Sequence, residues 1–270
     1  MSRAKRLSVE LLESDIVSTV KSIRSEAPGI GAYKLFLILK DICPDKMCGR
    51  DRFYRIMHDN GLMLKPYRKR HTTSSNHNYR KYRNLVRGFR PTAVNQLWVA
   101  DITYIETEEG VAYLHLLTDV FTHEIIGWRL SDSLKAGHTV EALRQGISRV
   151  GSYGLEGLTH HSDRGVQYCC GEYTELLRSI GARISMTEDG CPTDNAVAER
   201  VNGIIKQEWL YRMRRPADTA EAERLLRDII SFYNERRPHM GNPGYAPPVR
   251  MRNACTVKGR APELAHEGNI

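Results

Sequence analysis

Residues 97–130, LWVADITYIETEEGVAYLHLLTDVFTHEIIGWRL, consist of three runs rich in β-branched and aromatic residues. Turn-forming residues, such as the Glu-Glu-Gly of 108–110, separate the runs. Short runs of this composition bounded by turns are typical of strands. We therefore predict strands over 97–105, 110–120 and 123–130.

After these strands the pattern changes to strands that alternate with helices. The predicted elements are a helix over 136–149, a strand over 157–163, a helix over 168–180, a strand over 182–187, and helices over 194–212 and 217–236. Consecutive strands followed by alternating strands and helices describe an α/β fold, in which a five-stranded mixed sheet is flanked by helices.

Three shorter segments near the N-terminus have apolar residues at helical spacing, which predicts helices over 7–24, 32–41 and 50–60. The third ends at Asn60-Gly61, a pair that favours a left-handed helix end. It also carries Arg50, Arg52 and Arg55. The three helices are compatible with a helix-turn-helix-like domain, and an ordinary small helical bundle is the alternative.

Positive charge is concentrated between Asp59 and Asp101, where the sequence has no Asp or Glu. Its Thr-Thr-Ser-Ser-Asn centre and its prolines predict an extended linker. Aromatic residues alternate with the cations, a composition that suits contact with nucleic acid. A merely solvated linker would more often mix both charge signs. The cations are Lys65, Arg68, Lys69, Arg70, Arg80, Lys81, Arg83, Arg87 and Arg90.

The whole chain of 270 residues has a formal net charge of +8, which favours a polyanionic partner over a small metabolite. Solvation alone is the alternative explanation of this charge. The six cysteines form no Cys-x-x-Cys pair and have no histidines at zinc-finger spacing, which argues against a zinc site. No segment has the apolar length of a signal peptide or a membrane span, so we expect a cytoplasmic protein.

Two aspartates stand where the predicted sheet would place a functional site. Asp101 interrupts an apolar strand, and a buried carboxylate there is costly unless it is paired or binds a cation. An edge or outward-facing position is the alternative. Asp163 follows a predicted strand at its carboxyl end, where α/β sheets usually place their sites. A turn or helix-cap aspartate is the alternative there.

Residues 187–209, TEDGCPTDNAVAERVNGIIKQEW, contain five acids. Helical geometry, at about 100° per residue, gathers the apolar residues on one face and presents Glu199 on the other. Glu188 and Asp189 are predicted to be loop charges, and Asp194 to cap the helix. Glu208 projects on the apolar side and is predicted to be structural. A surface glutamate loosely paired with a lysine is the alternative for Glu199.

Acids from two strands and a helix can converge at one end of a sheet. Phosphodiester cleavage requires an activated nucleophile and a stabilised leaving oxygen, and two divalent cations supply both. Carboxylate oxygens are the ligands that suit Mg²⁺. Asp101, Asp163 and Glu199 together therefore predict a cluster whose mutual repulsion a bound metal relieves.

Four motifs resemble those of bacterial insertion-sequence transposases in the DDE superfamily, which also contains retroviral integrases. They are WVADITY (98–104), HSDRGVQY (161–168), DNAVAERVNGIIKQE (194–208) and YNERRPH (233–239). Thirty-five residues separate Asp163 from Glu199, which is the spacing characteristic of this group. The resemblance runs from about Gly31 to Pro248 and is specifically to the catalytic product of elements encoded in two overlapping frames.

This resemblance implies an RNase H-like integrase catalytic core in which Asp101, Asp163 and Glu199 are the catalytic and metal-binding triad. It implies Mg²⁺ as the cofactor, replaceable by Mn²⁺, with two ions per site. It also implies cleavage at element ends and attack of the freed 3′-hydroxyl on another strand. A homo-oligomer assembled on DNA, associated with the bacterial nucleoid, is expected from the same reaction class.

Further residues are carried over by position as DNA contacts. Lys206 is expected to contact phosphate, and Asn195 flanks the triad glutamate. Arg237 and His239 belong to the last motif, for which DNA contact and helix packing are both open. The complete set of expected DNA contacts is Lys206, Asn195, Arg68, Lys69, Arg70, Arg80, Lys81, Arg83 and Arg237.

The sequence departs from the family pattern in three respects. His123 stands where relatives commonly have Arg, and Arg200 where many have Ser. No sustained heptad repeat precedes Leu7, and the helix-turn-helix and leucine-zipper segment of the upstream frame is absent from this sequence. We therefore expect that recognition of element ends depends on fusion to, or pairing with, the upstream-frame protein.

The expected organisation is a helical, helix-turn-helix-like domain over 1–62, a basic linker over 63–92, the catalytic core over 93–240 and a C-terminal tail over 241–270. The expected function is a DNA transposase that cleaves and joins strands by metal-dependent phosphoryl transfer. A non-catalytic DNA-binding protein and an RNase H-like nuclease without strand transfer are the alternatives. The triad argues against the first, whereas the second would use the same metals.

Overall fold

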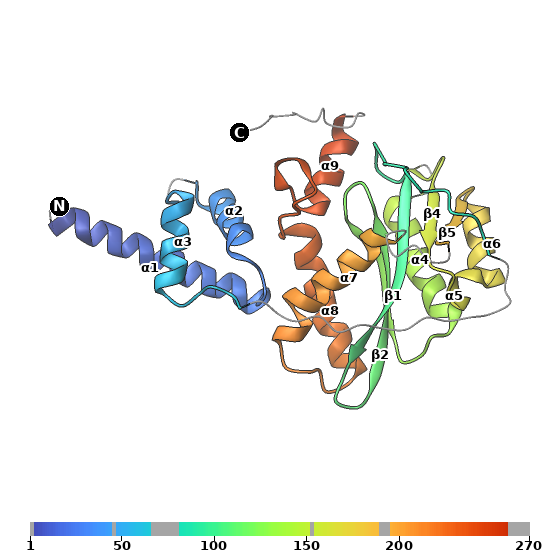
Figure 1. The fold of residues 1–270 in the computed structure, drawn as a ribbon, viewed down its shortest axis with the longest axis horizontal. Coiled ribbons are helices and arrows are strands. Elements are labelled where there is room, and N and C mark those ends of the chain that lie inside the picture. Colours follow the sequence, from blue (N-terminus) through green and yellow to red (C-terminus); the bar gives the residue numbers. More distant parts are fainter. Residues whose placement is uncertain (1–2, 45–46, 66–80, 152–153, 189–194, 259–270) are drawn as a thin grey trace.

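The computed structural model describes residues 3–44, 47–65, 81–151, 154–188 and 195–258, and a five-stranded sheet forms its centre (Figure 1). The strands are β1 (Leu97–Glu106), β2 (Val111–Asp119), β3 (Ile125–Ser131), β4 (Thr159–Ser162) and β5 (Arg183–Met186). Their order is β3-β2-β1-β4-β5. The β1–β2 and β2–β3 pairs are antiparallel, while β1–β4 and β4–β5 are parallel. The predicted mixed sheet is confirmed.

Helices cover both faces of the sheet (Figure 1). On one side lie α4 (Ala136–Val150), α5 (Val166–Cys169) and α6 (Gly171–Ser179), and on the other lie α7 (Ala196–Glu208) and α8 (Thr219–Glu235). Alternate strand residues serve these two layers, as the pleat requires. Trp98 and Ala100 pack in the apolar cluster with α4 and α6, whereas Leu97 and Val99 pack against Ala198 of α7.

Two of the predicted helices are interrupted. The helix expected over 168–180 is divided at Cys170, whose extended backbone separates α5 from α6. The helix expected over 194–212 ends at Glu208 and is followed by the short 3₁₀ helix η3 (Leu210–Arg212). Trp209 lies at this break, fully buried, and its indole N–H donates a hydrogen bond to the Glu26 carbonyl at 2.8 Å. Burial of this large side chain accompanies the change of chain direction.

Part of the expected C-terminal tail belongs to the core. A short 3₁₀ helix, η4 (Pro243–Tyr245), is followed by α9 (Pro248–Lys258), which packs against α8. Arg252 of α9 is buried, and its guanidinium donates to the Asn95 side-chain oxygen at 3.1 Å and to the Glu124 carboxylate. Residues 248–258 of the expected tail thus form a helix that a buried ion pair fixes to the turn between β2 and β3.

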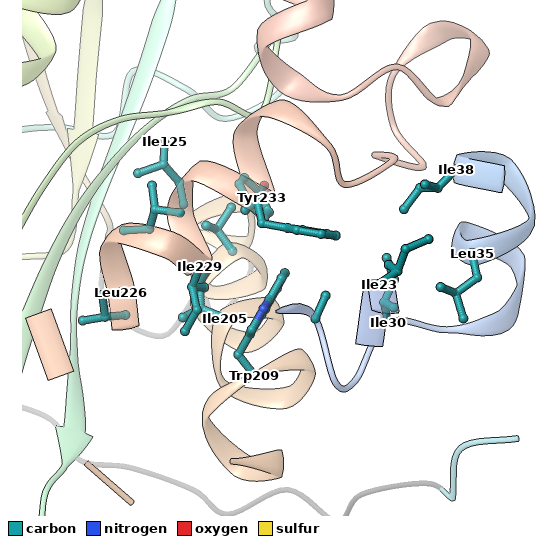
Figure 2. Packing of buried hydrophobic residues seen from close by; sticks show 14 of the residues in the cluster. Ile23, Ile30, Leu35, Ile38, Ile125, Ile205, Trp209, Leu226, Ile229 and Tyr233 are labelled. Atoms are coloured by element: carbon teal, nitrogen blue, oxygen red, sulfur yellow. The ribbon is translucent and has the colours of Figure 1, made fainter. Parts of the chain in front are cut away.

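The N-terminal helices α1 (Arg3–Glu26), α2 (Ala32–Ile42) and α3 (Arg50–Asp59) form where the apolar periodicity predicts them. As expected, Gly61 takes a left-handed conformation just after α3 (φ 65°). The apolar interior of these helices is continuous with that of the core. Figure 2 shows Ile23 and Ile30 on one side of this shared cluster and Ile205, Trp209 and Tyr233 on the other.

The link between α1 and α2 is pressed against the end of α7. The Gly29 N–H donates to the Glu208 carbonyl at 2.7 Å. A side chain at residue 29 would collide with this contact, since a Cβ there would lie 2.5 Å from the Glu208 Cα. The N-terminal helices are therefore docked onto the helix that carries Glu199.

The described end of the basic segment, residues 81–92, is packed along β5. The Leu85 N–H donates to the Ser185 hydroxyl at 2.8 Å, and Tyr82 packs against the apolar cluster on that side. Glu188 accepts from the Asn84 N–H at 3.3 Å, so it is more than the loop charge that we predicted. The predicted loop charge Asp189 and the predicted cap Asp194 lie outside the described residues. Among the helices that are described, none is long and apolar enough to cross a membrane.

Candidate active site

The parallel pair β1–β4 brings Asp101 and Asp163 to the same edge of the sheet. β4 pairs with β1 only from Leu97 to Ala100, and its last residue, Ser162, is opposite Ala100. Asp101 is therefore the first residue of β1 beyond the end of β4, and Asp163 is the first residue after β4. This is the carboxyl end of β4 and of the paired stretch of β1 and β4, a position where α/β folds usually place their sites.

Asp101 is partly buried and is held by α7. Its Oδ2 accepts a hydrogen bond from the Asn202 side-chain amide at 2.7 Å. Burial, reinforced by the charge of Asp163 and more weakly by that of Glu199, raises the pKa of Asp101 to about 7, although hydrogen bonds from Asn202 and the Ile102 N–H oppose the shift. A raised carboxyl pKa means that the folded chain itself compensates this negative charge poorly.

Asp163 occupies the turn between β4 and α5. It is exposed, and its Oδ1 accepts a hydrogen bond from the Gly165 N–H at 2.8 Å. An aspartate that bonds the backbone two residues ahead stabilises a turn of this kind. The turn therefore fixes the position of the carboxylate next to Asp101 while leaving it accessible from outside.

Glu199 lies in the first turn of α7 and is exposed, as predicted. The start of α7 is fixed to β1 because the Asn195 side-chain amide donates to the Ala100 carbonyl at 3.1 Å. This contact orients the helix so that Glu199 belongs to the same electrostatic environment as Asp101.

Two buried amide oxygens accompany the three acids. Asn195 and Asn202 each donate from the amide nitrogen to β1, and the Oδ1 atom of each is buried without a hydrogen-bond partner among the residues that the structure describes. A buried carbonyl oxygen normally accepts a hydrogen bond or binds a cation. The region around Asp101 therefore has unused acceptor capacity in addition to its unbalanced negative charge.

The side chains do not form a closed metal site as they stand. Within the described ranges, no three His, Cys, Asp or Glu side chains are grouped so that they could hold a metal ion. Asp101 is affected most by Asp163 among the charged neighbours and least by Glu199. The triad therefore stays a prediction, for which the structure supplies the paired aspartates and the nearby glutamate.

Lys206, on α7, extends past this edge of β1. Its Nζ lies 4.5 Å from the centroid of the Tyr104 ring. Burial lowers the pKa of Lys206, although the charges of Asp101 and Glu106 oppose this change. Lys206 makes no ion pair with any residue in the described part of the chain, so its positive charge has no carboxylate partner.

Comparison with known proteins gives a consistent assignment. Two models described as the integrase core domain match residues 91–192 and 180–248. The chain is 40% identical over 201 residues to the insertion element IS600 uncharacterized 31 kDa protein of Shigella sonnei, and this covers 72% of each chain. The chain belongs to the insertion-sequence transposases of the DDE and integrase superfamily.

Other similarities extend further along the chain. The transposase for insertion sequence element IS904 of Lactococcus lactis is 29% identical over 241 residues, covering 88% of this chain and 94% of that protein. Among solved structures, the HTLV-2 integrase catalytic core domain in complex with magnesium matches with a TM-score of 0.47 and 20% identity. That match covers 60% of this chain and 98% of the integrase domain.

In this transposase Arg237 is buried, which does not fit its expected role as a DNA contact. Its side chain is 4% exposed and donates two hydrogen bonds to Glu208, from Nε to Oε2 at 2.8 Å and from Nη2 to Oε1 at 2.9 Å. Lys34 of α2 contacts the same carboxylate at 2.6 Å. Burial alone would raise the pKa of Glu208, but Arg237 and Lys34 outweigh burial and lower it. The structural role predicted for Glu208 is confirmed.

The two single residues that depart from the family pattern lie in different environments. His123 stacks on His239 of the last motif, with ring centroids 3.9 Å apart, and its Nδ1 lies 2.9 Å from the Asn242 Oδ1. Arg200 follows Glu199 and is exposed. The transposase therefore uses His123 for packing between the β2–β3 turn and the segment after α8.

The remaining expected DNA contacts fall into three groups. Lys81 and Arg83 are exposed, whereas Asn195 is buried and bonded to β1. Arg68, Lys69, Arg70 and Arg80 lie outside the described residues.

Asn202 and Tyr104 were not among the residues expected at the site. Asn202 is three residues after Glu199, and residues at this spacing lie on the same side of a helix, so the helical pattern contained a signal for it. Tyr104 is recognisable only from the position of Lys206 in the folded chain.

Proposed function

We propose that Asp101, Asp163 and Glu199 form the centre at which this transposase cleaves element ends and joins them to another DNA strand. The observation that supports the proposal most strongly is the meeting of Asp101 and Asp163 at one sheet edge, where burial and mutual repulsion raise the pKa of Asp101. Carboxylates whose mutual repulsion is not compensated by the protein are typical of sites that hold divalent cations.

The donor atoms fit a divalent cation. Carboxylate and amide oxygens are the ligands that Mg²⁺ prefers. The Oδ1 atoms of Asn195 and Asn202 are buried and have no hydrogen-bond partner in the described part of the chain. We assign Asp101, Asp163 and Glu199 as the ligands of Mg²⁺, for which Mn²⁺ can substitute, with two ions per site. Bound cations would supply activation of the attacking oxygen and stabilisation of the leaving oxygen.

The protein's own groups support this centre. The Asn202 amide orients the carboxylate of Asp101, and the Asn195 amide fixes the start of α7 beside β1. Lys206 is placed to contact a phosphate of the DNA strand that enters the site. Orientation of reacting groups of this kind is a large part of phosphoryl-transfer catalysis.

DNA is the substrate, and several segments serve to hold it. We assign non-specific contact to the basic segment between Lys65 and Arg90, and helix-turn-helix-like contact to α3 with Arg50 and Arg55. Assembly of two or more copies on DNA follows from the need to bring two element ends together. Pairing with, or fusion to, the upstream-frame protein would then supply recognition of the terminal sequence.

The test uses purified protein, labelled DNA with the terminal repeats of the element, and Mg²⁺ or Mn²⁺. The wild type is compared with Glu199→Gln. Joined products that disappear in the variant support the proposal. Cleavage without joining would indicate a nuclease, and binding without cleavage a DNA-binding protein. Full joining activity in Glu199→Gln would contradict the assignment of the triad.

The basic segment gives a separate prediction. Replacing Lys81, Arg83 and Arg90 by alanine should weaken binding by about tenfold at low salt, because each cation releases counterions when it meets a phosphate. The slope of log affinity against log salt should fall by about 3, equally for all DNA sequences. Filter binding at several salt concentrations measures both quantities.

The control for this experiment removes exposed arginines elsewhere on the core. Arg144 and Arg227, at 65% and 70% side-chain exposure, lie on α4 and α8. Their replacement by alanine should leave the salt dependence nearly unchanged. A triple variant that loses sequence preference at an unchanged salt slope would show that the basic segment reads bases.

A further inference from the structure

The pair formed by Tyr104 and Lys206 stands at the free edge of β1. Beyond Ala100, β1 has no parallel neighbour among the described strands, because β4 ends at Ser162. Tyr104 lies in this stretch, which is paired with β2 on its other side, and it is 38% exposed. Lys206 reaches it from α7, which packs against β1, so the ring and the ammonium come from two different elements.

The ammonium of Lys206 has acidic groups near it but does not pair with them. Glu106 is occupied by an ion pair with Arg215, and Asp101 accepts its hydrogen bond from Asn202. The Tyr104 ring face, at 4.5 Å, is the contact that the structure gives to the ammonium. An aromatic face attracts a cation without neutralising it.

This arrangement lets Asp101 remain available to a metal while Lys206 remains available to a phosphate. A lysine paired with Asp101 would compete with a metal for that carboxylate and would lose its own attraction for phosphate. A lysine held by an aromatic ring leaves the Asp101 carboxylate unpaired with it and also loses less side-chain freedom when DNA binds. The ring therefore prepares Lys206 for a phosphate rather than for a carboxylate.

We propose that Tyr104 is a positioning residue for strand transfer, whose ring holds the Lys206 ammonium at the free edge of β1 for contact with a phosphate of the bound DNA strand. The proposal rests on the proposed function, since it concerns a substrate contact of the same site. In this role Tyr104 contacts Lys206 and affects joining only through the position of the Lys206 ammonium.

The experiment measures the joining rate of the full chain on a labelled duplex that carries a pre-cleaved terminal repeat, with Mg²⁺. Tyr104→Leu removes the ring, and Tyr104→Phe keeps it. Because Tyr104→Leu removes the cation–π contact that holds the Lys206 ammonium, it should reduce joining about tenfold. Tyr104→Phe should stay within about twofold of the wild type. Lys206→Met should reduce joining at least as much as Tyr104→Leu.

The double variant decides whether Tyr104 acts through Lys206. If it does, Tyr104→Leu combined with Lys206→Met should be no slower than Lys206→Met alone. Multiplied losses would overturn the proposal, as would a Tyr104→Phe variant as slow as Tyr104→Leu. Thermal unfolding checks that each variant is folded. If Tyr104→Leu does not fold, Tyr104→Trp provides a second variant that keeps an aromatic ring.

The same assay distinguishes failure of the role of Tyr104 from failure of the proposed function. If the wild type joins DNA and either Tyr104→Leu or Lys206→Met joins it at the same rate, the role of Tyr104 is overturned and the proposed function is left intact. A wild type that joins no DNA, under conditions where it binds the duplex, would overturn both.

Discussion

Replacing Asp101 by asparagine should abolish joining and, in metal-free buffer at neutral pH, make the protein more stable than the wild type. The proposed function makes Asp101 a metal ligand, and losing such a ligand would remove several kcal/mol of transition-state stabilisation, so the joining rate should fall by about 10³-fold or more. The gain in stability follows from the position of Asp101, which is partly buried and is repelled by the charge of Asp163. An asparagine can still accept the hydrogen bond from Asn202 but carries no charge to repel Asp163.

The pH dependence of this difference has a definite sign. The pKa of Asp101 rises from 3.8 in the unfolded chain to about 7 in the folded chain. Between these values the folded state holds a proton that the unfolded state has released, so the stability of the wild type falls as the pH rises from about 4 to about 7. Asp101→Asn lacks this loss. Its advantage in unfolding free energy should therefore be near zero at pH 4 and reach up to about 4 kcal/mol above pH 7.

Urea unfolding of both proteins across this pH range measures the difference, and Asp132→Asn is the control because Asp132 is exposed at the end of β3. Added Mg²⁺ should stabilise the wild type, since a ligand that binds only the folded state raises its stability. The same addition should not stabilise Asp101→Asn. A variant that is less stable than the wild type at pH 8 would show that Asp101 already has its compensating charge within the chain.

Replacing Arg237 by methionine should destabilise the protein by about 3–5 kcal/mol, because it removes one partner of a buried ion pair. Glu208 and Arg237 have side chains only 13% and 4% exposed. Without the guanidinium, Glu208 would keep Lys34 as its one described cationic partner. The midpoint of urea unfolding is the measurement.

The neighbouring residue provides a matched control. Arg236 forms an ion pair with Glu26, but both side chains are about half exposed (45% and 49%). Arg236→Met should therefore cost about 0–1 kcal/mol. Adding Glu208→Met to Arg237→Met should recover part of the loss, because an apolar pair replaces the unpaired charge. Equal effects at Arg236 and Arg237 would mean that the Glu208 network contributes no more than a surface pair.

Much of the fold follows from local pattern. The strands at 97–106, 111–119 and 125–131 are rich in β-branched and aromatic residues, and the helices α2 and α4 follow a clear apolar period. The outward position of Glu199 and the inward position of Glu208 also follow from helical geometry. These features depend on neighbouring residues in the sequence, which is why the sequence is sufficient to predict them.

The features that the sequence did not predict depend on contacts between distant segments. Arg252 is buried only because Glu124 lies opposite it in the folded chain, so α9 could not be distinguished from a tail. Arg237 is an ordinary charged residue until Glu208 and Lys34 meet it. The break at Trp209 likewise requires the pocket that α1 and its following turn complete.

In the site, too, some features follow from the local sequence and others from contacts between distant segments. The pattern of the motifs predicts the three acids, while the supporting amide of Asn202 and the ring of Tyr104 depend on how α7 lies across β1.

The most direct test replaces the oxygen ligand of Glu199 by sulfur and measures the joining rate of Glu199→Cys in Mg²⁺ and in Mn²⁺. A thiolate is a poor ligand for Mg²⁺ and a better one for softer metals. If Glu199 binds the metal with Asp101 and Asp163, joining should be undetectable in Mg²⁺ and partly restored in Mn²⁺, while Asp132→Cys should join normally in both. Joining at the wild-type rate in Mg²⁺, or an equal loss in both metals, would place Glu199 outside the metal centre.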